Sequence, residues 1–315
     1  MDPLDLKILR ETSRGRVMWW GSLDPRVSIR EVGRRLRIDP TTVWKRLHRW
    51  QIDGFLLGYS VVPNPTLFGA RLAGGSVRIS DSRAKERFFR DLGLIEGAAF
   101  AVDQVGPWVV VMFVFETERG LQRSAGLTRN LPGVTEMEPC IPFHCPKTTM
   151  TPSRLEWRIL EALRIHPMED LSQSARTVGV TSKTFTRRYN RLIRDLAVWS
   201  VPQLDFTRYR GATVARFLVW LRPQADSHRV LVRLEGSFPS YILLEDQTGL
   251  PDTGSKTVRL LSLFLQLSSA GEVEDADRVI REVDGVVDVE TYFPRRIYVY
   301  ADWFAERLER HIRQE

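Results

Sequence analysis

Two stretches of the sequence place short hydroxyl side chains and basic side chains at helical spacing. In the first, Thr41, Lys45 and His48 share one face, and Thr42, Trp44 and Arg49 flank it. In the second, Lys183, Arg187 and Asn190 share a face, with Thr184, Thr186 and Arg191 beside it. Hydroxyls and free N–H groups at a helix N-terminus bind phosphate, and longer cationic side chains reach base edges or the DNA backbone. The pattern predicts contact with double-stranded DNA, and the alternative is an ordinary solvated basic face.

Catalytic and metal-binding patterns are much weaker. The chain has no Gly-x-Ser-x-Gly, no phosphate-binding glycine loop and no His-Glu-x-x-His motif, so we predict no catalytic residue, no enzyme activity and no cofactor. Cys140, His144 and Cys145 lie close together, but no fourth ligand follows at a zinc-like spacing. We therefore predict no metal site, with a site at these three residues as the less favoured alternative.

Bulk composition is that of an ordinary folded protein with several domains. The chain has 315 residues, 43% hydrophobic and 27% charged, with a formal net charge of +7 and a pI near 9.7. A basic, Arg-rich chain favours polyanionic partners. A high arginine content is also explained equally well by genome composition or by growth temperature. The apolar run Val109–Phe115 is too short to cross a bilayer, and residues 1–5 lack a signal-peptide pattern. We predict a cytoplasmic protein with no membrane partner.

The first basic face is preceded by the pattern of a helix-turn-helix. Ile29, Val32 and Leu36 mark one amphipathic helix, and Asp39-Pro40 supplies an N-cap and a first-turn proline for the next. Val43, Leu47 and Trp50 form the buried face of that helix. Arg46 lies nearer this buried edge, which predicts a structural role. Residues 53–63 predict a helix stop followed by a small β-wing.

The same pattern occurs again in the second half of the chain. Phe185 lies 142 residues after Val43, and Gly211 lies 142 residues after Gly69. Thr181 caps the equivalent helix, whose apolar face is Phe185, Tyr189 and Leu192. Arg188 takes the place of Arg46 and has the same predicted role. Segments around 18–20 and 250–256 are the predicted insertions. Chance matching of apolar patterns is the weaker alternative, since order, spacing and residue type agree.

Each repeat continues into alternating strand and helix patterns in the order β-α-β-β-α-β. We predict an α+β protein with two winged helix-turn-helix domains, each followed by a ferredoxin-like βαββαβ domain. The first winged helix-turn-helix covers 1–64 and its ferredoxin-like domain 65–140. A proline-containing linker follows at 141–153. The second winged helix-turn-helix covers 154–206 and its ferredoxin-like domain 207–315, which ends in a helix at 303–312. The apolar strand at 109–115 is expected to be covered on both faces, so the two halves should pair.

Five segments together resemble the leucine-responsive regulator (Lrp/AsnC, feast/famine) family. They are Leu4-Asp5-x-x-Ile8-Leu9, Ser28-Ile29-x-Glu31-Val32, Val43-x-x-Arg46-Leu47, Asp53-Gly54-Phe55-Leu56-x-Gly58-Tyr59 and Leu67-Phe68-Gly69. The resemblance covers nearly the whole chain, taken twice. It implies a dimeric transcription factor with a winged helix and a βαββαβ domain that often binds an amino acid.

The resemblance and the repeat together suggest a single chain that imitates a family dimer and reads an asymmetric operator, and a further homodimer stays open. The family's effector loop reads Val105-Gly106-Pro107-Trp108 here and lacks the acid. Amino-acid sensing is therefore the less favoured expectation, a small-molecule effector stays open as a partner, and no effector-binding residue is assigned.

Two rival functions stay open. Sirohaem decarboxylases also resemble this family, but they use histidines near the tetrapyrrole, and the two α/β halves contain only His228 and His311. An architectural protein that coats DNA without sequence choice is the other rival.

Overall fold

The computed structural model describes residues 2–13, 25–143, 145–166, 169–209, 212–239, 241–246 and 259–314. The insertions predicted around 18–20 and 250–256, and His144, lie outside these residues. Among the described helices, none combines the length and apolar character that a membrane crossing requires.

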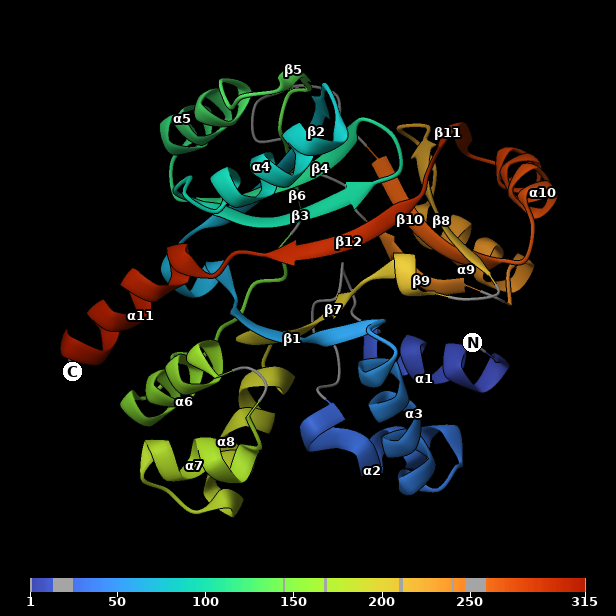
Figure 1. The fold of residues 1–315 in the computed structure, drawn as a ribbon. Helices are drawn as coiled ribbons and strands as arrows, with labels where there is room; N and C mark the ends of the chain where they lie inside the picture. The colour runs from blue at the N-terminus through green and yellow to red at the C-terminus, as the bar shows by residue number, and fades with distance from the viewer. Residues whose placement is uncertain are drawn as a thin grey trace.

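Two three-helix units lie side by side at one end of the molecule (Figure 1). The first contains α1 (Pro3–Ser13), α2 (Pro25–Leu36) and α3 (Pro40–Ile52). The second contains α6 (Arg154–Ile165), α7 (Leu171–Val178) and α8 (Ser182–Arg194). The third helix of each unit begins at the residue that its predicted cap requires, because Asp39 accepts from the Thr41 amide and Thr181 from the Thr184 amide.

The strand that follows each unit pairs with its counterpart from the other half. β1 (Leu56–Pro63) and β7 (Val198–Leu204) form a two-stranded antiparallel sheet in which Tyr59 faces Pro202. In place of the small β-wing predicted at 53–63, the structure has one long strand whose partner comes from the other half of the chain. A strand with an apolar pattern and no neighbour in its own unit needs an outside partner for its backbone N–H and C=O groups.

Each half contains one antiparallel sheet with two helices. The first has β2 (Arg71–Ile79), α4 (Ser82–Leu92), β3 (Ala98–Gln104), β4 (Trp108–Phe115), α5 (Glu118–Arg129) and β5 (Val134–Met137). The second has β8 (Thr213–Leu221), α9 (Ser227–Ser237), β9 (Tyr241–Asp246), β10 (Arg259–Leu267), α10 (Ala270–Arg281) and β11 (Val286–Tyr292). The orders β3-β4-β2-β5 and β11-β8-β10-β9 are equivalent, and both halves have the predicted βαββαβ arrangement. Two short 3-10 helices, Pro65–Phe68 and Phe206–Arg208, precede the sheets.

Two further strands extend the first sheet. β6 (Ile141–Phe143) lies in the predicted linker and pairs with β2, where Pro142 occupies a short edge strand. β12 (Pro294–Val299) pairs with β3, although it belongs to the segment 207–315 that we assigned to the second domain. Arg295 also reaches Asp103 of β3 at 3.4 Å. β3 would otherwise be an open sheet edge, and the returning chain covers it. α11 (Asp302–Gln314) then packs on α6.

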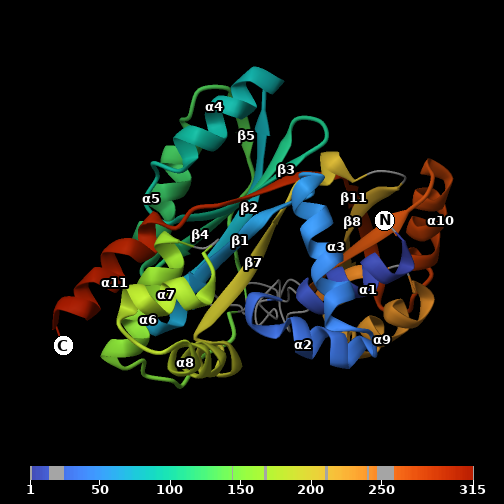
Figure 2. The same cartoon turned by 60° about the horizontal axis from the view of Figure 1, so that its bottom comes forward.

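The two sheets face each other, so β4 has buried residues on both sides. Val109, Val111 and Phe113 pack with α4 and α5 in one apolar cluster. Met112 and Val114 belong to a second cluster, which also contains Phe264 of the second sheet. In Figure 2 the paired strands β1 and β7 cross the middle of the molecule, with the first sheet on one side and β8 of the second sheet on the other. The halves therefore form one packed body.

Candidate nucleic-acid interface

α3 presents an exposed polar face opposite its buried one. Val43, Leu47 and Trp50 are buried, and the opposite side chains, Thr41, Lys45 and His48, are exposed. Hydrogen bonds from Thr41 lower the pKa of the capping Asp39 carboxyl. This cap fixes where the helix begins and which residues occupy its first turn.

The α3 face also carries a large aromatic side chain. Trp44 is 51% exposed and stacks on His48, with ring centroids 5.0 Å apart and planes 13° apart. Thr42 is half-buried, and Arg49 is exposed. The sequence placed Trp44 beside the polar face, but the stacking depends on side-chain conformation. An exposed aromatic ring supported by an imidazole supplies a flat apolar surface between polar groups.

α8 presents the equivalent face in the second half. Phe185, Tyr189 and Leu192 are buried. The predicted contact residues Lys183, Arg187, Asn190 and Arg191 are exposed, and Thr184 is half-buried. The two faces differ in chemistry, because Lys45 and His48 in the first half correspond to Arg187 and Asn190 in the second.

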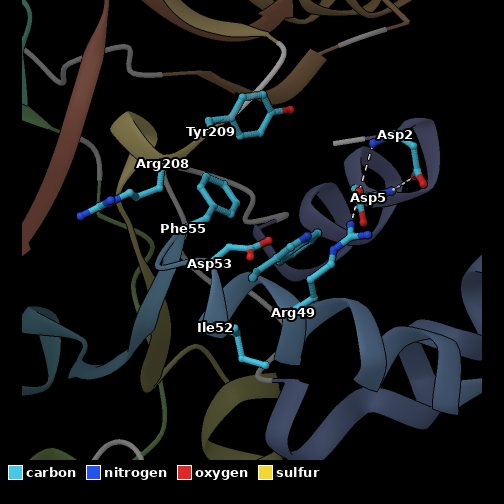
Figure 3. Close-up of a pocket in the computed structure, with 9 residues that line it drawn as sticks. Asp2, Asp5, Arg49, Ile52, Asp53, Phe55, Arg208 and Tyr209 are labelled. Carbon is cyan, nitrogen blue, oxygen red and sulfur yellow. Dashed lines mark hydrogen bonds and ion pairs between the residues drawn. The ribbon is translucent and has the colours of Figure 1, made fainter.

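A buried acid in the first helix holds the third helix of the first unit. Asp5 is fully buried and accepts from Arg46 at 2.8 Å and from Arg49 at 2.7 Å. Figure 3 shows the Arg49 guanidinium directed at Asp5. Hydrogen bonds to Asp5 and Asp2 raise the pKa of Arg46. The predicted structural role of Arg46 agrees with this contact, whereas Arg49, predicted to contact DNA, also has an intramolecular partner.

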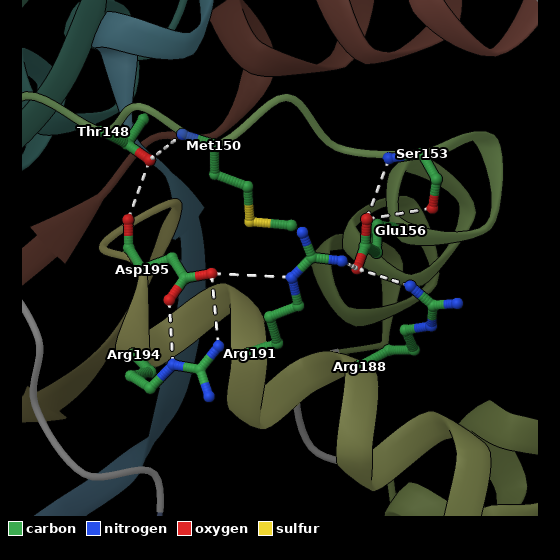
Figure 4. Close-up of polar contacts among 8 residues, drawn as sticks. All are labelled: Thr148, Met150, Ser153, Glu156, Arg188, Arg191, Arg194 and Asp195. Atoms are coloured by element: carbon green, nitrogen blue, oxygen red, sulfur yellow. Dashed lines mark hydrogen bonds and ion pairs between the residues drawn. The ribbon is translucent and has the colours of Figure 1, made fainter.

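The second unit repeats this ion pair. Glu156 is fully buried and lies 3.3 Å from Arg188 and 3.4 Å from Arg191 (Figure 4). Glu156 also accepts from the amide of Ser153, which completes a capping box at the start of α6. Arg191 further contacts Asp195 at 3.5 Å. Its exposed side chain is therefore shared between two carboxylates, and it is less free than Lys183 or Arg187 to reach a ligand.

Sequence reasoning did not single out the two acids. Their signal is present, since Glu156 follows Asp5 at the spacing by which Ile159 follows Ile8. Aspartate and glutamate differ in length by one methylene, so the equivalence becomes visible only where both are seen to reach the same pair of arginines.

A segment of the second half fixes the C-terminal end of α3. Phe55, just after α3, packs on Phe206 and Tyr209, with ring centroids 6.0 and 5.3 Å apart. A cavity of about 620 Å³ opens beside this contact, lined in part by Asp53 and Arg208 (Figure 3). The orientation of the first unit therefore depends on the second half of the chain.

The N-terminal turns of the two polar helices border one groove. Thr41 and Trp44 of α3 and Ser182 and Thr186 of α8 line a cavity of about 610 Å³. In dimeric helix-turn-helix proteins the two recognition helices sit in successive major grooves, about 34 Å apart. Helices that line one cavity of this size are much closer than that.

The first 49 residues match the family model of winged helix-turn-helix DNA-binding proteins. Over 86 residues the chain is 33% identical to a proline dehydrogenase transcriptional activator from Rhizobium radiobacter. That alignment covers 27% of this chain and 49% of the activator, so the chain spans about half the length of the curated relative it matches.

One solved structure shares the fold over nearly the whole chain with little sequence identity. The siroheme decarboxylase NirDL, bound to an iron-uroporphyrin III analogue, matches with a TM-score of 0.53 at 15% identity. The match covers 99% of this chain and 98% of that one. An AsnC family transcriptional regulator from Agrobacterium tumefaciens covers 45% of this chain, with a TM-score of 0.30 at 20% identity.

Proposed function

We propose that this chain, which carries a winged helix-turn-helix of the DNA-binding family in its first 49 residues, is a sequence-specific transcriptional regulator. The observation that supports this most strongly is the exposed face of α3, with Thr41, Lys45 and His48 opposite a fully packed core face. A short hydroxyl in the first turn, the Lys45 ammonium one turn later and the His48 imidazole after that match the needs of a helix lying in a major groove.

The residues proposed to contact DNA fall into two groups. Lys45, His48 and Arg187 are exposed, and none of them has an ion pair with the described residues. Arg49 and Arg191 each bind a buried carboxylate. We therefore assign base or phosphate contact to the first group, and phosphate positioning to Arg49 and Arg191 through the part of each guanidinium that stays exposed.

The proposed DNA site is asymmetric and compact. The two faces differ in side-chain chemistry, which disfavours a palindrome, and the shared groove at their N-terminal turns disfavours two half-sites one full turn apart. One helix would enter the major groove while the other lies against the adjacent backbone. The repeat within one chain makes this divergence possible, because each helix changes independently.

Selection of bound fragments from a random DNA pool at near-physiological salt tests the function. We expect one asymmetric motif to be enriched. If no motif is enriched, the chain coats DNA without sequence preference. Enrichment of a symmetric repeat, or of two motifs one helical turn apart, would contradict the proposed arrangement.

Charge removal then identifies the helices involved. Lys45→Ala and Arg187→Ala should each weaken binding by about 1 to 3 kcal/mol if they contact bases, or reduce the salt slope by about 1 if they contact phosphate. Arg123→Ala is the matched control, since Arg123 is exposed on α5, which lies at the opposite end of the molecule from α3 and α8 (Figure 1). If all three variants bind alike, the proposed interface is wrong.

A tetrapyrrole decarboxylase is the second candidate, because the likeness to NirDL extends over the whole chain. The cavities described above do not favour it. A uroporphyrin-type substrate is a polycarboxylate, yet Asp2, Asp5 and Asp53 outnumber the arginines of the 620 Å³ cavity. His311 is stacked on Trp157, with ring centroids 4.6 Å apart, and not placed in a described cavity. Addition of iron-uroporphyrin III should leave the Soret band unshifted, and a saturable shift would favour the enzyme.

A further inference from the structure

A cavity of about 380 Å³ lies between the two α/β sheets. Val110 and Ile141 line it from the first sheet, and Leu218 and Leu260 from the second. Gly74 of β2 shares the face of Leu72, which points toward the second sheet, because side chains alternate along a strand. Gly74 therefore lines the cavity with backbone atoms alone.

Two carboxylates line this largely apolar cavity, one from each half of the chain. Glu290 of β11 is fixed in place, because Trp220 Nε1 donates to one of its oxygens at 3.2 Å and the Tyr292 hydroxyl donates to the other at 2.6 Å. Glu138, just after β5, is exposed, and its side chain has no ion pair or hydrogen bond with the described residues. Glu290 is thus a preorganised acceptor and Glu138 an available one.

One cation, Arg216, also lines the cavity. It is 7% exposed, donates from Nε to the Ser262 hydroxyl at 2.9 Å, and lies over the Phe264 ring. These contacts anchor it to the second sheet. Two carboxylates and one guanidinium leave the lining with a net negative charge. Burial, the hydrogen bond to Glu290 and the charges of Glu290 and Glu138 raise the pKa of the neighbouring Tyr292, and the charge of Arg216 opposes this.

We propose that this cavity is a binding site for a small organic cation, an amine with an apolar body. The aliphatic walls and the Trp220 indole would cover the apolar body, and Glu290 and Glu138 would hold the ammonium group. The volume lies at the low end of the range for small-molecule sites, which favours a single-ring ligand. Because the two carboxylates come from different halves, such a ligand would bridge the two sheets.

Charge complementarity favours an organic cation over a neutral molecule or an organic acid. A neutral molecule of the same shape would bury the same apolar surface but leave Glu290 without a cationic partner. An organic acid would meet two carboxylates and a single guanidinium, Arg216, which is already held by Ser262 and the Phe264 ring, so the net charge of the lining disfavours it. The proposal concerns binding alone and holds whether or not the chain binds DNA.

Isothermal titration calorimetry with three probes that share a phenethyl group tests the site on the full chain. The probes are phenethylamine, 2-phenylethanol and 3-phenylpropionate. We expect the amine to bind at least about tenfold more tightly than the alcohol, since hydrogen bonds between ionised groups are about twice as strong as neutral ones. The acid should show no saturable binding.

Matched variants then locate the bound amine. Glu138→Gln and Glu290→Gln should each reduce the affinity for phenethylamine at least about fivefold and leave the affinity for 2-phenylethanol unchanged. Glu136→Gln is the control, because Glu136 is exposed on β5, two residues before Glu138. If Glu290→Gln does not fold, the affinity of Glu138→Gln for phenethylamine alone tests the site. The proposal is overturned if amine and alcohol bind equally, if the amine does not bind at millimolar concentration, or if Glu138→Gln binds it like wild type.

Discussion

Asp5 in α1 and Glu156 in α6 occupy equivalent places in the two helical units. Each is fully buried, and each binds two arginines that are three residues apart in the third helix, Arg46 with Arg49 and Arg188 with Arg191. The acid ties the first helix to the third, so it sets the direction in which the exposed face of the third helix points. A shared ion pair of this kind is strong support for a duplicated helical unit.

Removing either acid should destabilise the protein. Asp5→Asn and Glu156→Gln each leave two arginines without their buried partner, and we expect the free energy of unfolding to fall by about 2 kcal/mol. This is less than for a fully buried pair, because the arginine side chains are 23 to 49% exposed. Urea denaturation measures the effect. Asp284→Asn, at a side chain that is 91% exposed, should change the stability by less than about 0.5 kcal/mol, and equal effects in all three variants would contradict the role of the acids.

The same substitution at two glycines should have opposite effects. Gly54 has a φ of +73°, and an added Cβ would meet only Arg208 Cγ, at 3.8 Å. Gly54→Ala should therefore cost about 1 kcal/mol through backbone strain alone. Gly126 lies in α5 with nothing within 4 Å of its added Cβ, so Gly126→Ala should stabilise by up to about 1 kcal/mol. Thermal unfolding of both variants is the measurement, and shifts of the same sign would show that the strain argument fails.

The charge on Glu31 predicts an acid-dependent contribution to stability. Hydrogen bonds from Arg34 and Arg35 lower the pKa of Glu31 from 4.5 to about 2. A lowered folded-state pKa means that the stabilisation is complete above about pH 4.5 and is lost as the pH falls toward 2. The difference in stability between wild type and Glu31→Gln should therefore shrink over that interval. High salt should reduce it at every pH, because the pair is exposed.

Glu274→Gln supplies the comparison for this titration. Glu274 is exposed on α10 and makes no ion pair with the described residues. The difference in the free energy of unfolding between Glu274→Gln and wild type should stay nearly constant between pH 4.5 and 2. If the difference in the free energy of unfolding between Glu31→Gln and wild type also stays constant, Arg34 and Arg35 do not bind the Glu31 carboxylate in solution.

Both cysteines should react slowly with alkylating reagents. Burial raises the pKa of Cys140 to about 11 and that of Cys145 to about 12. Only the thiolate reacts, so at pH 8 Cys140 should be alkylated by iodoacetamide roughly a hundredfold more slowly than a thiol with the ordinary pKa of 9.0. Peptide mapping by mass spectrometry gives the rate at each site. The denatured chain should react at the ordinary rate, and fast labelling of the folded protein would indicate that the thiols are accessible.

Local chemistry in the sequence was sufficient to place the polar helix faces. The caps at Asp39 and Thr181 and the spacing of Val43, Leu47 and Trp50 depend on residues a few positions apart, so helical geometry alone fixes which side chains share a face. The repeat at 142 residues likewise follows from the sequence, and so does the βαββαβ order of each half.

Tertiary structure alone decided which strands pair and which charges are free. β1 and β7 pair across the halves, and β12 completes the sheet of the half to which it does not belong in sequence. Backbone hydrogen-bonding groups are identical in every strand, so an edge strand carries no signal for its partner, and packing of the whole chain makes the choice. The sequence predicted a structural role for Arg46 and DNA contact for Arg49, and only the packed α1 revealed the carboxylate that binds both.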